Sequence, residues 1–405
     1  MTAMISTMPA PARTSRRRVL GILLLTATIW LPRPSLQSAE SSGRFDLNRY
    51  PTSTEPFPLA ITGFSGEVLS TLRFDLEVAG CKAVSETEAQ LILAGSNAGQ
   101  VEGRLMDRNK SIVFSKAYNG GAPRQQAHAL ADDVVKALGG RGVAQTQIAF
   151  KGEITQGKSE VYVADYDGHN AQKATSDGSI VAAPTWVPGK RALVYTSYRL
   201  GNPDIFFHDL SGSRRPLSRQ AGLNTAGAVS PDGQTLAMIL SKDGSPNVYT
   251  MRMDGSGLKR LTDNRQGDSS PCWSPDGQTI CFSSRSGGPS SLYTISASGG
   301  QPRHLRLVGV SNGTEPDWSP DGKMIVFTTQ SGGRFEVCVV PAAGGEVNRL
   351  VPGEDPVWAP NSRTVVCARR IGEGNRVLSL LDVPTRQTKD LPRISGSCSQ
   401  PTWAR

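Results

Sequence analysis

The sequence lacks several features that would define a fold class or an activity at once. Charged residues make up only 20% of the 405-residue chain and aromatic residues 6%, a composition that argues against a coiled coil. Glycine does not recur at every third position, which excludes a collagen-like chain. No run of three basic residues comes after Arg16–Arg18, whereas a nucleic-acid-binding surface needs clustered basic charge. The 38% hydrophobic content can still build a core, so wholesale disorder is also disfavoured.

Long apolar runs are scarce, and the one near the N-terminus is short. Arg16–Arg18 precede an apolar stretch from Leu20 to Leu31, which as a helix would rise about 18 Å against a hydrocarbon core of ~30 Å. This length favours a cleaved export signal, ending near residue 39, over an uncleaved membrane anchor. Ser15–Arg17 also resembles a twin-arginine signal, so the Sec and twin-arginine routes both remain open. We therefore expect a periplasmic mature protein without a membrane span.

The chain does contain a repeat. Six segments end alike, with anchor positions at residues 186, 229, 273, 318, 358 and 403, spaced 40 to 45 residues apart. The clearest copies read Trp-Ser-Pro-Asp-Gly, as in Trp273–Gly277 and Trp318–Gly322. Proline fixes φ, aspartate bonds its own backbone and glycine accepts a positive φ, so this sequence is a turn. Such even spacing predicts a repeat architecture.

Each repeat unit reads as four short strands. After the anchor strand and its turn come two runs rich in β-branched and aromatic residues, for example Thr279–Phe282 and Ser291–Thr294. A glycine-containing turn then leads to a fourth strand such as Lys259–Thr262. Residues 147–175 supply only strands two to four, and Trp403 is an anchor with nothing after it. We therefore predict a six-bladed β-propeller over residues 142–405, closed by the C-terminal strand rather than left as an open solenoid.

A different module precedes the repeats. One strand is expected at Pro58–Ile61, and Ser65 is placed to cap a helix with apolar residues at helical spacing. Three strand-like runs and a second helix come next, the helix from about Pro123 to Leu138 with Gly139 and Gly140 stopping it. The order β-α-β-β-β-α predicts a small two-layer α+β domain over residues 58–141, after a flexible segment at 40–57. The expected fold class is thus an α+β domain followed by an all-β propeller.

The combination of these residues resembles the TolB family of the Tol-Pal cell-envelope system. The Trp-Ser-Pro-Asp-Gly repeats, Asp165–Asn170 and His128–Asp132 carry the resemblance, which runs from about Leu59 to the C-terminus. It implies a non-enzymatic periplasmic scaffold whose propeller binds the peptidoglycan-associated lipoprotein Pal at one channel mouth. It also implies roles in outer-membrane integrity, envelope constriction at cell division and macromolecule import. The family's N-terminus engages the inner-membrane protein TolA, but Arg44–Tyr50 matches that segment poorly.

One motif mimics a nucleotide-binding loop. Gly152–Ser159 fits the P-loop pattern G-x-x-x-x-G-K-[ST] letter for letter. A phosphate cradle needs a helix N-terminus directly after it, because the helix amides bind the anion. The next residues, Glu160–Asp165, instead form an alternating β-branched run that predicts a strand. We therefore interpret the motif as a loop between two blade strands.

Other patterns give no support for a metal, a cofactor or an enzyme. The four histidines (128, 169, 208 and 304) are too scattered for a zinc motif. Gly63–Glu67 fails the G-x-S-x-G nucleophile pattern at its last position. The repeated Asp-Gly turns offer one carboxylate each, too few for the six to eight oxygen ligands of Ca²⁺. We expect no catalytic residue, no metal site and no cofactor.

Six cysteines in an exported protein permit disulfides. Around the turn Pro275–Gln278, Cys272 faces Cys281 across two antiparallel strands. Directly opposed residues of a non-hydrogen-bonded pair lie ~4.5 Å apart at Cα, within disulfide reach. A Cys272–Cys281 bridge and two buried free thiols both remain open. The other four cysteines (Cys81, Cys338, Cys367 and Cys398) cannot be paired from the sequence.

The channel mouth is the expected binding surface. Loops that lead into the innermost anchor strand lie at this mouth, and loops on a rigid scaffold are where function concentrates. The candidate partner-binding residues are polar or acidic: Asn224, Thr225, Asp268, Ser269, Asn312, Thr314, Glu315, Glu354 and Asp355. Their polar and acidic character suits recognition of a polar partner. The resemblance implies that this partner is a Pal-like lipoprotein, with a TolA-like protein as a second partner of the N-terminus; we expect a monomer that binds no nucleic acid. The alternative is a propeller sensor for a small ligand or glycan, which an aromatic-lined mouth would favour.

Overall fold

The computed structural model describes residues 53–405 except for 156, 373, 392–393 and 395. These residues belong to one compact unit, Phe45–Arg405. The predicted signal peptide at 1–39 and most of the segment at 40–57 lie outside the described residues.

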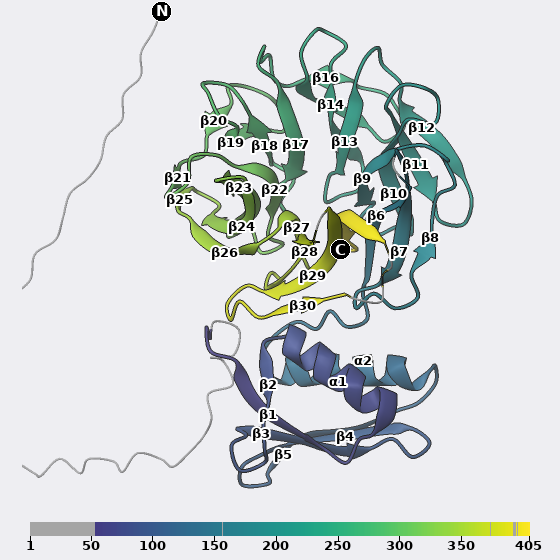
Figure 1. The fold of residues 1–405 in the computed structure, drawn as a ribbon, viewed down its shortest axis with the longest axis vertical. Coiled ribbons are helices and arrows are strands. Elements are labelled where there is room, and N and C mark those ends of the chain that lie inside the picture. The colour runs from purple at the N-terminus through teal and green to yellow at the C-terminus, as the bar shows by residue number, and fades with distance from the viewer. Residues whose placement is uncertain (1–52, 156, 373, 392–393, 395) are drawn as a thin grey trace, which may run out of the picture. The chain divides into compact units, whose positions relative to one another are not determined.

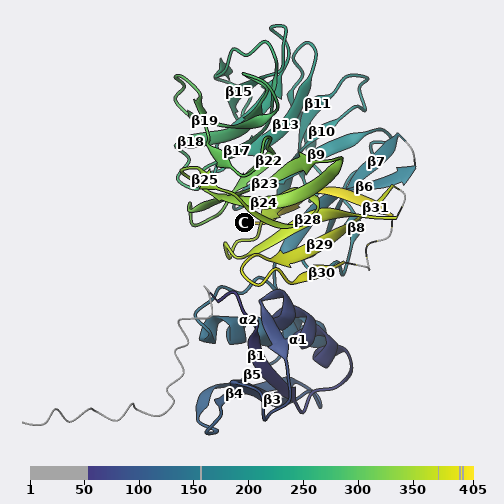
Figure 2. The ribbon, with the colours of Figure 1, turned by 60° about the vertical axis from the view of Figure 1, so that its left-hand side comes forward.

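The first module is a five-stranded sheet covered by two helices. Its elements are β1 (Phe57–Thr62), α1 (Gly66–Val78), β2 (Cys81–Ala83), β3 (Leu91–Ser96), β4 (Val101–Asp107), β5 (Ile112–Tyr118) and α2 (Pro123–Ala137). The strand order is β2-β1-β3-β4-β5, with β1 parallel to β2 and β3 and the other pairs antiparallel. Figures 1 and 2 both show α1 and α2 on the same face of this sheet.

The apolar faces of the two helices form the core of this module. Leu72, Leu76, Leu130 and Val134 are fully buried against the inner face of the sheet, as the helical spacing of the apolar residues predicts. Two local expectations need correction. Ser65 occupies the N-cap position of α1, but its side chain makes no capping hydrogen bond; its amide instead donates to Asn97 Oδ1 at 3.0 Å. The short strand β2 was missed, because three residues give no readable alternation.

The rest of the described chain forms six four-stranded sheets arranged around a centre (Figure 1). Their strands, blade by blade, are β6 (Gln147–Thr155), β7 (Lys158–Asp165), β8 (Gln172–Lys173) with β31 (Ser397–Trp403); β9 (Val181–Trp186), β10 (Ala192–Ser197), β11 (Asp204–Asp209), β12 (Arg214–Ser218); β13 (Asn224–Val229), β14 (Thr235–Leu240), β15 (Asn247–Arg252), β16 (Lys259–Arg260); β17 (Asp268–Trp273), β18 (Thr279–Ser284), β19 (Ser291–Ser296), β20 (Arg303–His304); β22 (Thr314–Trp318), β23 (Met324–Ser331), β24 (Arg334–Pro341), β26 (Asn348–Pro352); and β27 (Glu354–Trp358), β28 (Thr364–Ile371), β29 (Asn375–Asp382), β30 (Thr388–Asp390). Two short strands, β21 (Leu307–Val308) and β25 (Gly345–Glu346), form a small parallel sheet. β25 lies between β24 and β26 of the fifth blade in the sequence. The fold class is the predicted one, a six-bladed propeller after an α+β domain.

Hydrophobic layers between neighbouring blades hold the ring together. The layer between the third and fourth blades, for example, joins Ile239 and Val248 to Ile280 and Phe282. Each sheet is therefore buried on both faces, which is why all six residues of β10 are buried. Burying one such side chain fully stabilises a fold by about 1.5–3 kcal/mol.

The ring is closed by strands from the two ends of the propeller sequence. β31 pairs antiparallel with β6, with Trp403 opposite Ile148 and Thr402 opposite Ala149. In Figure 1 the yellow β31 lies beside the blue β6. The Trp403 indole donates to Thr146 Oγ1 at 2.7 Å, which fixes the last anchor against the first residues of the propeller.

The P-loop-like motif is part of a hairpin. Gly152 lies in β6 and Ser159 in β7, and the two strands pair antiparallel throughout this region. A strand therefore takes the place of the helix whose amides would bind phosphate. The interpretation as a blade loop is confirmed.

Candidate partner-binding channel

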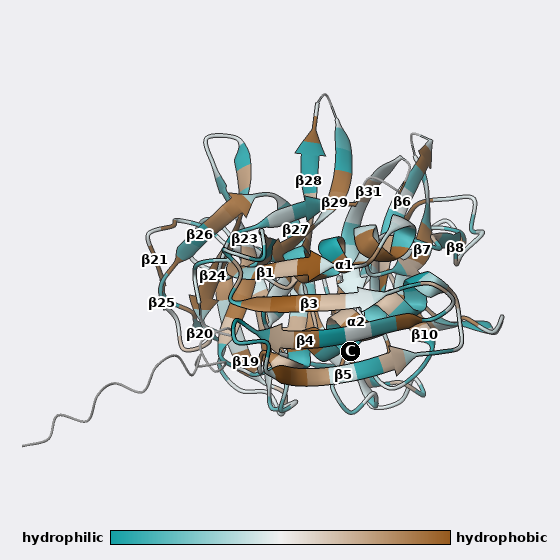
Figure 3. Ribbon diagram, turned by 90° about the horizontal axis from the view of Figure 1, so that it is seen from below, coloured by the Kyte–Doolittle hydropathy of each residue, from teal (hydrophilic) through white to brown (hydrophobic). Residues whose placement is uncertain are grey.

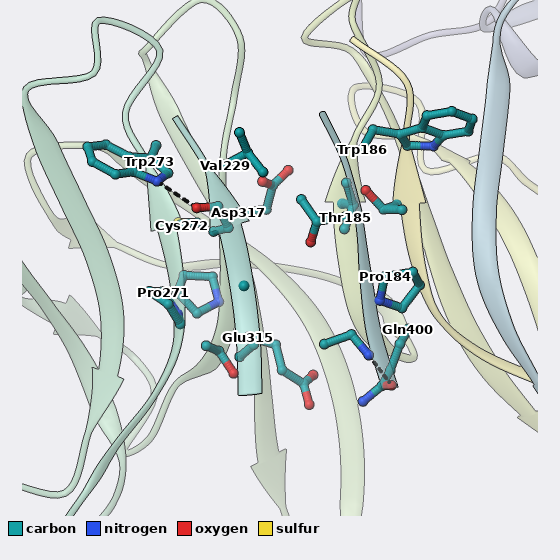
Figure 4. A pocket seen from close by; sticks show the side chains of 18 of the residues that line it. Pro184, Thr185, Trp186, Val229, Pro271, Cys272, Trp273, Glu315, Asp317 and Gln400 are labelled. Atoms are coloured by element: carbon teal, nitrogen blue, oxygen red, sulfur yellow. Dashed lines mark hydrogen bonds between the residues drawn. The ribbon is translucent and has the colours of Figure 1, made fainter. Parts of the chain in front are cut away.

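The innermost strands of the six blades line a central channel. Its cavity measures about 870 Å³ and is bounded by β9, β13, β17, β22, β27 and β31. Figure 4 shows Glu315, Gln400, Pro184 and Pro271 toward one end and the Trp186 and Trp273 side chains toward the other. The first end carries the loops that precede the anchor strands, so it is the mouth predicted from the sequence.

A ring of strained residues surrounds the channel near this mouth. In every innermost strand, one residue close to the start of the strand has a φ between 47° and 54°; these residues are Ala183, Ala226, Ser270, Glu315, Asp355 and Gln400. At each of them the pairing with the second strand shifts register, which is a β-bulge. A left-handed conformation costs an L-residue roughly 1–2 kcal/mol. All six of these residues line the channel. The amides of Ala183, Asp355 and Gln400 also donate hydrogen bonds to the neighbouring blade.

Three ring residues bind the next blade. The Asp355 amide donates to Glu315 Oε2 at 2.9 Å, and the Gln400 amide donates to Asp355 Oδ2 at 3.0 Å. The Ala183 amide in turn donates to Gln400 Oε1 at 2.9 Å. This relay runs from the fifth blade through the sixth and first to the second, across the joint where the ring closes.

The relay places two carboxyl groups together in a partly buried site. Burial raises the pKa of Asp355 to about 8, and the negative charge of Glu315 adds to the shift. The two carboxyl groups also share a side-chain hydrogen bond, and Thr328 Oγ1 donates to Glu315 at 2.7 Å. Asp355 therefore keeps its proton to a higher pH than an ordinary aspartate.

A third carboxyl group, that of Asp317, lies deeper in the channel. Asp317 accepts a hydrogen bond from the Trp358 amide at 2.8 Å and pairs with the Arg405 guanidinium. Burial raises the pKa of Asp317, and Arg405 opposes that shift. Arg405 also donates to the Trp358 carbonyl at 3.1 Å, so the last residue of the chain links two inner strands. The sequence analysis did not identify Gln400, Asp317 or Arg405. Gln400 directly precedes an anchor proline and Asp317 an anchor tryptophan, and these repeat positions were the available signal; Arg405, two residues after Trp403, had none.

Five of the nine predicted partner-binding residues line the channel near its mouth. They are Thr225, Asp268, Ser269, Glu315 and Asp355. Ser269 is exposed, Asp268 is buried, and the other three are partly buried. Partner binding by these residues stays a prediction.

The other four residues, together with Asp268, hold loops in place. Asn224 is fully buried and accepts from Ser218 Oγ at 2.7 Å and from the Gln220 amide at 2.8 Å. Asp268, only 4% exposed, accepts from Thr262 and Asn264. Asn312 and Thr314 bond the neighbouring strand β23, and Glu354 pairs with Arg370 and Arg376. The carboxylates of Asp268 and Glu354 are therefore bound to partners within the protein rather than presented to solvent.

The tryptophans that border the cavity offer little ring surface for stacking. Trp186, Trp318 and Trp403 are at most 9% exposed. The partly buried Trp273 donates its indole N–H to the Ala228 carbonyl at 2.9 Å. These four rings therefore do not make the mouth aromatic, which is the feature that would favour the small-ligand or glycan alternative.

Of the two alternatives left open for Cys272 and Cys281, the structure shows two buried free thiols rather than a disulfide. The two residues do face each other in the register expected, but both are free thiols. A hydrogen bond between the thiols, together with burial, raises the pKa of Cys272 well above its usual value. Disulfide formation proceeds through the thiolate, and this environment suppresses it. The other four cysteines are also buried and free, and burial raises the pKa of each to about 12.

Two motifs that carry the family resemblance, His128–Asp132 on α2 and Asp165–Asn170 in the first blade, meet in one buried cluster. His128 Nδ1 lies 2.7 Å from Asp75 Oδ2, and Tyr166 donates its hydroxyl to the same carboxylate. Arg124 pairs with Asp167. Burial and the charge of Asp75 raise the pKa of Tyr166 well above its usual value. This cluster fastens α1 and α2 to the first blade, which is a structural role.

The described residues contain neither a membrane-spanning helix nor a metal-binding cluster. Residues 53–405, apart from the gaps given above, contain no helix that combines the length and apolarity needed to cross a bilayer. The same residues hold no group of three or more histidine, cysteine, aspartate or glutamate side chains arranged to bind a metal ion.

Comparison with known proteins points to one family. Residues 135–405 match the profile described as the TolB β-propeller domain. The Tol-Pal system protein TolB of Anaeromyxobacter dehalogenans is 35% identical over 159 residues, 38% of this chain and 36% of that protein. Its counterpart in Desulfosudis oleivorans is 31% identical over 191 residues, 45% of this chain and 43% of that protein. The aligned region thus spans less than half the length of these curated relatives.

A solved structure extends the similarity to most of the chain. The crystal structure of TolB from Acinetobacter baumannii superposes with a TM-score of 0.78 at 25% identity, covering 86% of this chain and 97% of that one. One chain of the crystal structure of a nidogen/laminin complex superposes with a TM-score of 0.52 at 13% identity, covering 64% of this chain and 98% of that one, which shows a shared fold alone.

Proposed function

Because the chain belongs to the TolB β-propeller family, we propose that it is a non-enzymatic, periplasmic protein-binding component of a Tol-Pal-like envelope system. Its partner at the channel mouth is a peptidoglycan-associated lipoprotein. Through that partner it supports outer-membrane integrity, envelope constriction at division and macromolecule import. A TolA-like contact belongs to the residues before 53.

The observation that carries the proposal is the construction of the mouth. Ser269 and Thr225 border an open cavity on a rigid ring, whose joints are fixed by the relay through Glu315, Asp355 and Gln400. The two carboxyl groups there accept hydrogen bonds from backbone amides of the next blade. We therefore assign them a structural role rather than a role in acid–base chemistry. A preformed opening of this kind, bordered by polar loops on a repeated scaffold, suits recognition of a protein surface.

The test is direct binding of the mature chain, from Ser41, to the soluble domain of the same organism's peptidoglycan-associated lipoprotein. We expect saturable binding in calorimetry. Ser269→Arg places a bulky cation in the mouth and should weaken binding at least tenfold. Gln278→Arg, on the exposed turn after β17 at the other end of the channel, is the matched control and should leave the affinity unchanged. Absence of binding by the unmodified chain would refute the proposal; saturable binding of a small ligand in its place would favour the sensor alternative.

A further inference from the structure

A second cavity lies between the third and fourth blades, at the end of the ring opposite to the mouth. It measures about 520 Å³ and is bordered by the turns that follow β13 and β17 and by Thr235 and Thr250 of the third blade. Each of these turns comes where an innermost strand ends, whereas the mouth surrounds the starts of those strands. Figure 3 shows the β28–β29 hairpin extending beyond its sheet at the mouth end. The cavity is therefore distant from the loops of the mouth.

An aromatic ring borders both this cavity and the central channel. The ring is that of Trp273, the least buried of the five anchor tryptophans. Its indole N–H donates to the Ala228 carbonyl of the third blade, whereas the Trp318 indole donates to the carbonyl of Gly322 in its own turn. The anchor next to Ala228 is Val229, where the other five blades have tryptophan. The smaller side chain leaves room for the Trp273 ring at this joint.

Two carboxylates border the cavity, one from each turn. They belong to Asp232 and Asp276. In each, Oδ1 accepts hydrogen bonds from a serine hydroxyl and a backbone amide of the same turn, and these bonds lower the pKa of both carboxyl groups. Within the described residues, the Oδ2 atoms accept no hydrogen bond and neither carboxylate forms an ion pair. The cavity is thus lined by two negative charges that the protein leaves unbalanced.

The next blade shows how such a charge is balanced elsewhere in the ring. In the turn of the fifth blade, the corresponding carboxylate of Asp321 lies 3.4 Å from Lys323 Nζ. At the position of Lys323 the third and fourth blades have Gln234 and Gln278. The lining of the cavity includes no lysine or arginine. Two neighbouring turns therefore lack the cation that their repeat position can carry.

A buried hydroxyl also faces this space. Thr250 borders the cavity and is only 7% exposed. Among the described residues, no group forms a hydrogen bond with its Oγ1. Buried polar groups normally have a partner, so this hydroxyl can bind a polar group of a molecule in the cavity.

We propose that this cavity is a binding site for a small organic cation, an ammonium compound with a polar group. Asp232 and Asp276 supply the negative charge, and the Trp273 ring attracts the cation through its π electrons. The Thr250 hydroxyl binds the polar group of the same molecule. The volume lies within the usual range of small-molecule sites, about 300–1,000 Å³. The inference does not depend on the proposed function, which concerns the mouth.

The test uses choline as the probe and its uncharged isostere, in which carbon replaces the nitrogen, as the matched compound. A ligand-detected NMR titration of the mature chain, from Ser41, should show saturable binding of choline and at least tenfold weaker binding of the isostere. Asp232→Asn with Asp276→Asn keeps the acceptors of the turns without the charge and should weaken choline binding at least tenfold. Thr250→Val should weaken it at least threefold. Asp321→Asn, the same change in the next blade, is the control and should alter the affinity less than twofold.

A further variant lets the protein occupy its own site. Gln278→Arg places a guanidinium beside the two carboxylates, as Lys323 is placed beside Asp321 in the fifth blade, and should abolish choline binding. Absence of saturable choline binding by the unmodified chain, or equal affinity for the isostere, overturns the inference. Choline binding that is insensitive to Gln278→Arg or to the paired aspartate variant overturns it as well. Urea unfolding of each variant checks that the fold is unchanged.

Discussion

The chemistry of the channel depends on a few buried side chains. Glu315 and Asp355 lie side by side in one partly buried site, where burial and the charge of Glu315 raise the pKa of Asp355 to about 8. Their acceptors bind amides of the next blade, so titration of the pair and stability of the ring are linked. From the sequence both residues read as exposed acids of a loop; only the bulge geometry turned them inward.

The pH dependence of stability is governed in part by Asp355. Its pKa in the folded protein is about 8, above the ordinary value of 3.8. Between these pH values the folded state keeps a proton that the unfolded state has released, so stability falls as pH rises from about 4 to about 8. The slope is at most about 1.4 kcal/mol per pH unit.

We expect Asp355→Asn to remove most of this slope in urea unfolding at pH 5 and pH 8, because the amide keeps the acceptor for Gln400 without the charge. Asp276→Asn is the control. A hydrogen bond from Ser274 lowers the pKa of Asp276, so its loss should not reduce the fall in stability toward pH 8. An unchanged slope in Asp355→Asn would contradict the assignment.

The repeating turn defines each blade hairpin. Between the first and second strands, Gly189, Gly233, Gly277 and Gly322 all have φ between 68° and 75°. In the sixth blade, Ser362 takes this place with φ 54°. In this turn the Ser274 hydroxyl donates to Asp276, which also accepts from the Gln278 amide at 3.0 Å. This turn chemistry could be read from the sequence, because it depends only on neighbouring residues.

Gly277→Ala tests the need for a left-handed conformation. Space is available, since an added Cβ would come no closer than 3.8 Å to Pro231. The cost is therefore backbone strain alone, about 1 kcal/mol in the free energy of unfolding. Gly277→Asn should cost less, because asparagine tolerates this conformation. Equal stability of the alanine variant and the unmodified chain in urea titrations would show that the turn does not demand glycine.

The whole ring depends on its closure. β31 completes the first blade, and Trp403 packs in the layer between the sixth and first blades. Without this strand, β6 becomes an open edge and the channel loses Gln400 and Arg405. Open edges of this kind pair with other chains. The incomplete units at the two ends of the repeat region pointed to this arrangement.

Removal of residues 397–405 should therefore prevent the chain from folding cooperatively as a monomer. We expect aggregates in size-exclusion chromatography. Trp403→Ala is the graded version and should cost about 3–5 kcal/mol, the usual loss for a buried tryptophan. Ser399→Ala, on a partly buried position of the same strand, is the control and should change stability little. A truncated chain that stays monomeric and unfolds like the full one would mean that closure does not hold the ring.

The sequence alone determined the repeat, the number of blades, the four-strand unit and its turns, because each depends on periodicity or on adjacent residues. It also placed Cys272 opposite Cys281 and ruled out the phosphate loop. Tertiary structure decided which residues of the mouth face the channel, since a bulge in each inner strand redirects side chains by one position. It likewise decided that Asp268 and Glu354 are internal. That burial arises because loops of different blades come together at one end of the ring, and no local pattern in the chain records that proximity.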